Sequence, residues 1–207
     1  MPKHVRASAL TALTVAALAA GTVLTAPAAG AATQAAAPKF LSASQLPPHP
    51  SSTWTAGPVT EGFPEGLGTC VSTEGVPSYE YRYREFHTDL DASAVQLTVV
   101  ADTATLAKAL AKHYDDLIRT CADRIERNDP DTAAEGRYYG KLPVEEGATV
   151  RGLHTETSWG ANDVSLLSVG RDGRTVTVVQ WGQLGDFGGA PVSAFKKTTT
   201  TAVNKLY

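Results

Sequence analysis

The sequence predicts an α+β domain in which a twisted, mainly antiparallel sheet is covered by two amphipathic helices. Several segments alternate apolar and polar residues, as half-buried strands do. An Asp-Gly turn at 172–173 joins two of these segments, and this dipeptide favours a tight hairpin. Two other stretches repeat apolar residues at the helical period.

The first 31 residues have the pattern of a Sec-type signal peptide. Basic residues at 3 and 6 precede an apolar run over 9–24, and small residues follow at 29–31. An uncleaved anchor is the alternative, but the run is short and rich in Ala and Thr for a bilayer span. No cysteine lies at the cleavage region for lipid attachment. We therefore expect a secreted, extracellular protein without a membrane span after cleavage.

The charge balance argues against nucleic-acid and anionic-membrane partners. Removing Lys3 and Arg6 lowers Lys+Arg from 18 to 16 against 21 Asp+Glu, so the mature net charge is −5. The basic residues do not cluster in the sequence, since Arg82 and Arg84 alternate with acidic neighbours. This pattern is typical of a solvated, mixed surface.

Cys70 and Cys121 are the only cysteines of the chain. In an exported protein two cysteines favour a disulfide over free thiols. A catalytic cysteine is the weaker alternative, because neither residue has an adjacent His or a basic helix start to lower its pKa.

The beginning of the mature chain is predicted to be a linker. Residues 32–53 are rich in Ala, Pro and Ser, so we expect a single ordered domain over 54–207. The Gly- and Pro-rich stretch 57–70 predicts a loop that brings Cys70 to the domain.

The next segments predict two strands and a helix. Residues 78–87 and 93–102 alternate as strands do, with Val95, Leu97 and Val99 on one face. Residues 101–130 then repeat apolar positions on one helical stripe that includes Cys121. Asp102 or Thr103 can cap the start of this helix.

The second half predicts four strands and a closing helix. The strands are expected over 136–142, 148–159, 163–170 and 174–182, and the helix over 190–207. The connection 185–191, "GDFGGAP", resembles the nucleophile loop of chymotrypsin-like proteases, but Phe187 stands where the serine would be. The chain also lacks the early histidine pattern and the all-β fold of that class. We interpret the loop as a tight strand-to-helix connection.

Few residues suggest catalysis. Strand alternation places His154, Glu156 and Ser158 on one face, where an acid/base pair or a metal site could form, although a solvated sheet face is the commoner arrangement. No other catalytic, metal or cofactor motif is present, so we expect no cofactor. His113 falls near the helical stripe, where a hydrogen-bonded interfacial histidine is expected.

Taken in order, these features resemble the PknH-type extracellular sensor domain of actinobacteria. The similar features are the signal peptide, the lead "LSASQLPP", a Cys in a Gly-rich loop, the strand "SAVQLTVVAD" and the helix "ATLAKALAKHYDDLIRTCADRI". The resemblance implies an α+β domain with a cleft between helices and a twisted sheet that binds an unknown ligand. This chain departs from the family in having one cysteine pair instead of two, and neither kinase nor lipobox.

The sequence thus predicts a secreted, non-enzymatic domain that binds a small molecule or an envelope component. A protein partner or inhibitor role, and a small hydrolase using His154 and Glu156, are the alternatives. Aromatic residues with a polar atom suit a recognition surface, so a cleft lined by Tyr81, Tyr83, Tyr139 and Trp181 is the predicted site. In that arrangement Arg82 and Arg84 face solvent together and could hold an anionic group. Alternatively, Tyr79, Tyr81 and Tyr83 pack inward.

Overall fold

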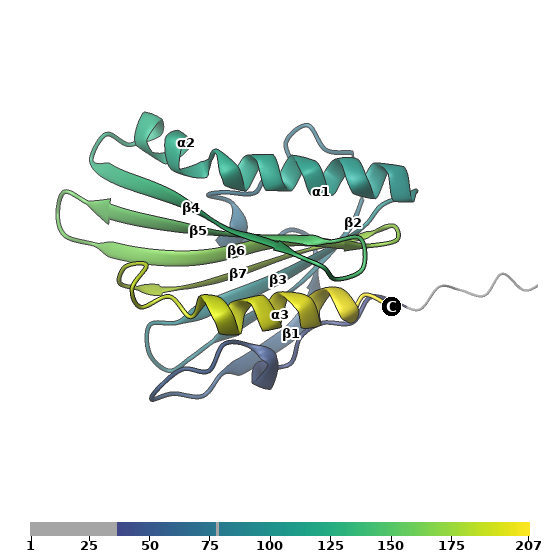
Figure 1. Cartoon of the computed structure of the whole chain (residues 1–207), viewed down its shortest axis with the longest axis horizontal. Coiled ribbons are helices and arrows are strands. Elements are labelled where there is room, and N and C mark those ends of the chain that lie inside the picture. Colours follow the sequence, from purple (N-terminus) through teal and green to yellow (C-terminus); the bar gives the residue numbers. More distant parts are fainter. Residues whose placement is uncertain (1–36, 78) are drawn as a thin grey trace, which may run out of the picture. The chain divides into compact units, whose positions relative to one another are not determined.

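The computed structural model describes residues 37–77 and 79–207, which belong to one compact unit (Figure 1). The predicted signal peptide and the first residues of the predicted linker, 32–36, lie outside the described residues. No helix in the described ranges is long and apolar enough to cross a membrane.

Seven strands form a single sheet in which every neighbouring pair is antiparallel. Their order across the sheet is β1-β2-β3-β7-β6-β5-β4. The strands are β1 (Thr55–Glu61), β2 (Glu80–His87), β3 (Ser93–Val100), β4 (Thr132–Leu142), β5 (Ala148–Thr157), β6 (Asn162–Asp172) and β7 (Thr175–Leu184). The predicted hairpin at Gly173, whose φ is 53°, joins β6 to β7. The α+β class and the mainly antiparallel sheet are confirmed.

Helices cover both faces of this sheet, as Figure 1 shows. Helices α1 (Ala104–Arg119) and α2 (Cys121–Asn128) lie on one face, and α3 (Val192–Asn204) lies on the other. Alternate residues of β3 accordingly join different cores: Leu97 packs in the α1 core, whereas Ala94 packs in the α3 core. The predicted helices thus cover the sheet from two sides and not from one. An amphipathic helix shows which of its own sides is buried, but not which sheet face it covers.

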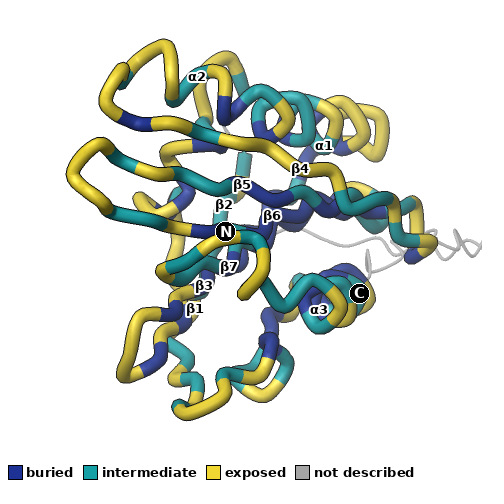
Figure 2. The backbone as a smooth tube through the Cα atoms, turned by 60° about the vertical axis from the view of Figure 1, so that its left-hand side comes forward, coloured by how far each residue is buried: buried dark blue, intermediate teal, exposed yellow. Residues whose placement is uncertain are grey.

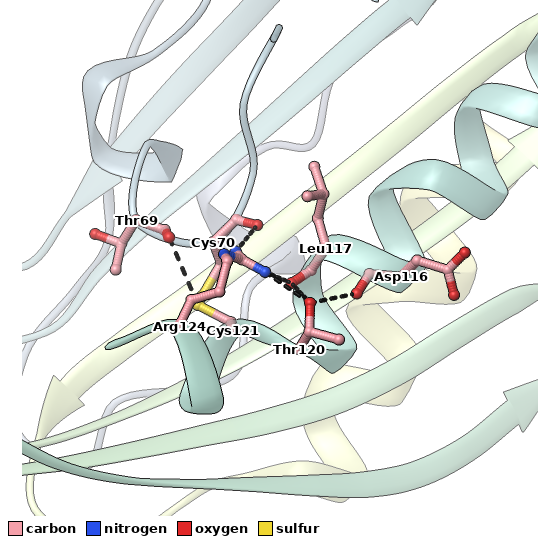
Figure 3. Close-up of a disulfide and its surroundings, with 7 residues drawn as sticks. All are labelled: Thr69, Cys70, Asp116, Leu117, Thr120, Cys121 and Arg124. Carbon is pink, nitrogen blue, oxygen red and sulfur yellow. Dashed lines mark hydrogen bonds between the residues drawn. A yellow bond between two sulfur atoms is a disulfide. The ribbon is translucent and has the colours of Figure 1, made fainter. Parts of the chain in front are cut away.

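The predicted helix over 101–130 is divided at Thr120. Thr103 caps its start by accepting a hydrogen bond from the Leu106 amide at 3.2 Å, and the Thr120 hydroxyl turns back to the Asp116 carbonyl at 3.0 Å. Figure 3 shows the Arg124 side chain beside this break. Its guanidinium donates to the Leu117 carbonyl at 2.7 Å, to Thr120 Oγ1 at 2.7 Å and to the Cys70 carbonyl at 3.2 Å. Arg124 thereby ties the helix break to the cysteine loop.

The predicted disulfide between Cys70 and Cys121 is present, with a Cα–Cα distance of 5.2 Å (Figure 3). Both cysteines are buried in the α1 core. The bond therefore anchors the loop before β2 to the start of α2.

The predicted linker extends too far into the domain. Phe40, Leu41 and Leu46 are buried on the α3 side, around the short 3₁₀ helix η1 (Ala43–Gln45). The Leu41 amide donates to Oε1 of Gln96 at 2.7 Å, and the Lys39 amide donates to the Lys205 carbonyl. These contacts fix the segment to the sheet, so the ordered domain begins before Trp54.

Strand β1 occupies part of the stretch predicted as a loop. It is an edge strand that pairs with β2, and its register shifts between Ala56 and Val59. Pro58 lies within this irregularity, where a missing amide donor is tolerated. The following 3₁₀ helix, η2 (Glu65–Leu67), leads to Cys70.

Close packing explains the position of α3. A side chain at Gly170 would place its Cβ 2.3 Å from Val203 Cγ2 and 3.1 Å from Ala148 Cβ, so the helix rests directly on β6. The buried face of α3 holds Phe195, Thr199 and Val203, as the helical pattern predicts. Figure 2 shows burial along the central strands and exposure at the turns.

Candidate ligand-binding site

An open cleft of about 230 Å³ lies between the first half of α1 and the loop before β2. Helical spacing builds one wall, because positions i, i+3, i+4 and i+7 share a side of the helix. These positions are Leu106, Ala109, Leu110 and His113. The other wall consists of Gly75, Val76, Pro77 and Tyr79. Small side chains at Gly75 and Ala109 leave space between the walls, so the lining is mainly apolar.

His113 is the notable polar residue in this cleft. Its Nε2 atom is buried and has no hydrogen-bond partner among the described residues. A buried nitrogen without a partner is costly, because folding removes its water without replacing the hydrogen bond. The expectation of a hydrogen-bonded histidine therefore fails for Nε2 among the described residues.

Tyr114 places a second unmatched polar atom under the same part of the helix. Its side chain is fully buried in the α1 core, and its hydroxyl forms no hydrogen bond of good geometry in residues 37–77 and 79–207, although the Tyr81 hydroxyl lies near it. Burial, together with the neighbouring Tyr81 and Tyr79, raises the pKa of Tyr114. The phenol therefore stays protonated, and its O–H remains a hydrogen-bond donor.

The four residues predicted as one ligand site do not share a cleft. Tyr81 and Tyr83 are partly buried against the α1 core, whereas Tyr139 and Trp181 pack in the α3 core. The sheet separates the two pairs, and Trp181 is only 3% exposed. The single-cleft arrangement is therefore corrected, because alternating residues along these strands point to opposite faces.

Part of the tyrosine row still lies near the new cleft. Tyr79 lines it, and the Tyr81 hydroxyl donates a long hydrogen bond of 3.5 Å to the carbonyl of Pro77, another lining residue. The three β2-side tyrosines pack towards the α1 core, which matches the alternative that they face inward. The sequence did not identify His113 as a site residue, although helical spacing places it on the same side of the helix as Leu106 and Leu110.

The two arginines of β2 do not form a free anion site. Arg84 donates from Nε to the Gly57 carbonyl at 2.8 Å and from Nη1 to the Leu41 carbonyl at 3.1 Å. These bonds hold β1 and the N-terminal segment together. Arg82 Nε is buried and has no partner among the described residues.

His154 and Glu156 lie on the α3 side of β5. His154 Nε2 is hydrogen-bonded to Asn162 Oδ1 at 2.5 Å, and its ring lies 5.6 Å from that of Phe187. The Phe187 ring also stacks under the Arg137 guanidinium at 4.1 Å and covers Gly152. The loop 185–191 thus places Phe187 as a packing residue over the sheet, as its interpretation as a strand-to-helix connection requires. No group of three or more His, Cys, Asp or Glu side chains in the described part of the chain could hold a metal ion.

The fold and the cleft together define an α+β domain with an apolar, histidine-containing recess at the edge of its helical layer. Neither a family model nor a curated protein matches the chain. Among solved structures, the chain is similar to the extracellular domain of PknH from Mycobacterium tuberculosis, at 16% sequence identity and a TM-score of 0.47. The match covers 81% of this chain and 98% of that domain.

Proposed function

We propose that this chain is an exported, non-enzymatic sensor-like domain that binds a small, mainly apolar molecule in the cleft beside α1. The observation that carries the proposal is a mainly apolar recess whose lining includes His113, a residue with a buried Nε2 that has no partner among the described residues. A recess with an apolar lining and few polar groups is the usual form of a small-molecule site. The resemblance to an extracellular domain accords with export.

The size and chemistry of the cleft limit the ligand. An apolar cavity of about 150 Å³ accommodates benzene, so about 230 Å³ suits one ring or a short branched chain with a substituent. The substituent should carry one hydrogen-bonding atom for His113, which can donate or accept depending on its tautomer. A charged group would lose its hydration in this lining, so an uncharged ligand is favoured.

Nothing in the geometry favours the hydrolase alternative. His154 is hydrogen-bonded to the side-chain amide of Asn162. Ser158 lies in the β5–β6 turn, where its backbone amide donates to the Asp131 carbonyl. A general base oriented by a carboxylate and placed beside a nucleophile is the arrangement that hydrolysis by a serine would require.

The test is an NMR titration of the purified chain with a panel of small aromatic and branched aliphatic alcohols, phenols and amides. Ligands that bind should shift the His113 ring resonances and the amides of residues 75–77. Leu106→Trp, which fills the cleft from a partly exposed position, should abolish binding. His113→Phe should weaken it about tenfold, which corresponds to about 1.4 kcal/mol for one lost hydrogen bond.

His154→Ala is the matched control, since it removes a histidine on the opposite face and should leave binding unchanged. Equal weakening by His154→Ala and His113→Phe would contradict the proposed site. The same proteins should show no turnover of ester, peptide, phosphate or glycoside reporters. Turnover that is abolished by His154→Ala or Glu156→Ala would favour the hydrolase instead.

A further inference from the structure

A second cleft lies on the other flank of α1. It has a volume of about 310 Å³ and is bounded by the helix, the β4–β5 turn and the end of β6. Four cationic side chains line it: Lys108, Lys112, Lys141 and Arg171. The chain has more acidic than basic residues, so a concentration of cations around one recess is a local feature and not a consequence of composition.

One of the two carboxylates in this lining, Asp115, is already engaged. Its Oδ1 accepts from Arg151 Nε and from Thr149 Oγ1, both at 2.8 Å, and its Oδ2 accepts from Arg151 Nη2 at 3.0 Å. Burial disfavours the charged carboxylate, but the hydrogen bonds from Arg151 and Thr149 outweigh burial and hold the pKa of Asp115 below its usual value. Asp115 therefore neutralises Arg151, which is not part of the cleft lining, and does not pair with any of the cleft lysines.

The other carboxylate, Glu146, accepts the Gly173 amide with both oxygens, at 3.2 and 3.0 Å, and lies 3.5 Å from Arg171 Nη1. Lys112 is paired with Asp116 at 2.5 Å. Lys108 on α1 and Lys141 on β4 remain, and neither forms an ion pair with any residue in the described ranges. Two unpaired ammonium groups thus flank the recess from different elements.

We propose that this cleft binds a doubly charged phosphate group between Lys108 and Lys141, either as the free ion or as a small monoester. A dianion matches two uncompensated ammonium groups, whereas a carboxylate would leave one of them unmatched. Arg171, whose side chain is only 15% exposed, is offset by Glu146 at 3.5 Å, so the two lysines supply the free positive charge. The site is separate from the apolar cleft and does not depend on the function proposed for it.

The experiment is a calorimetric titration of the full chain at low ionic strength with inorganic phosphate, glycerol 1-phosphate and acetate. Phosphate or its monoester should bind at least tenfold more tightly than acetate, and binding should weaken as salt is added. The comparison of phosphate with glycerol 1-phosphate decides between a free ion and a monoester. Lys108→Ala/Lys141→Ala should reduce the affinity at least tenfold.

Lys39→Ala/Lys197→Ala is the matched control, because it removes the same net charge at positions that do not line the cleft. Denaturant unfolding of both double variants shows whether either loses its fold. Equal loss of affinity in the two double variants would show that binding depends only on the net charge of the protein, and this result would overturn the proposal. Binding of acetate as tight as that of phosphate, or no phosphate binding at all, would overturn it as well.

Discussion

The two faces of the sheet bury polar groups in opposite ways. The α3 face carries several buried polar side chains that are matched, which means that each has a hydrogen-bond partner. Gln96 Nε2 donates to Thr177 Oγ1, and Thr199 Oγ1 donates to Ser168 Oγ. The core on the α1 face is almost entirely apolar, yet two of the three unmatched buried side-chain atoms found in the described residues belong to its helix. The third, Arg82 Nε, belongs to a strand near the sheet edge. Of the three unmatched atoms, only His113 Nε2 belongs to a residue that lines the cleft proposed as a binding site.

The largest expected effect concerns the disulfide on the α1 face. Replacing both cysteines, Cys70→Ser/Cys121→Ser, should lower the free energy of unfolding by about 4 kcal/mol, because the bond closes a loop with a sequence separation of 51 residues. Urea unfolding followed by far-UV circular dichroism measures this loss.

Chemical reduction of the wild-type chain under the same conditions provides the control, and it should reproduce the loss. A loss below about 1 kcal/mol would mean that the Arg124 bonds to Cys70 and Thr120 alone hold the loop against the helix break. Hydrogen bonds, and not the covalent bond, would then hold the cysteine loop on the α1 face.

The second prediction contrasts one matched and one unmatched polar residue. Gln96→Leu on the α3 face should cost about 1–3 kcal/mol, because it leaves the buried Leu41 amide without an acceptor. Tyr114→Phe on the α1 face should cost less than about 0.5 kcal/mol or stabilise the domain, because it removes a buried hydroxyl that has no partner. Denaturant unfolding of both variants gives the comparison.

Tyr83→Phe serves as a control for removing a phenol hydroxyl from the same side of the sheet at a half-buried position. A cost above about 1 kcal/mol for Tyr114→Phe alone would show that its hydroxyl has a partner in solution, such as the neighbouring Tyr81 hydroxyl or a bound water. The α1 face would then be as well matched as the α3 face.

Local patterns predicted most of the framework. The apolar stripe, the cap at Thr103 and the Asp-Gly turn each depend on neighbours in the sequence, so α1 and the β6–β7 hairpin followed from them. Strand β1 and the docked N-terminal segment did not follow, because Pro58 and a few apolar residues among prolines indicate a loop unless their tertiary partners are known. Those partners, β2 and Gln96, lie far along the chain.

The candidate site was less accessible from sequence. Strand alternation identified the tyrosine row and the burial of Val95, Leu97 and Val99, but not the helix that covers the second face. His113 could be placed near the helical stripe, yet the absence of a partner for Nε2 among the described residues depends on what packs against the helix, including residues 75–77 and 79. Hydrogen-bond satisfaction is a property of the assembled fold, whereas periodicity belongs to the sequence.

The smallest expected effect concerns Asp115, at the boundary between the α1 core and the basic cleft. Its pKa is lowered in the folded state, so its contribution to stability is complete above the ordinary Asp value of about 3.9 and is lost as the pH falls through the folded-state pKa. Asp115→Asn should therefore unfold more easily than the wild type at pH 7, and the difference should shrink steadily below about pH 4. The partly exposed pair should contribute no more than about 1 kcal/mol. Urea unfolding at several pH values between 7 and 2.5 measures the difference, with Asp163→Asn, an exposed aspartate without an ion pair among the described residues, as the control. A difference between wild type and Asp115→Asn that stays constant across this range would show that the carboxylate stabilises α1 through its shape and not through its charge.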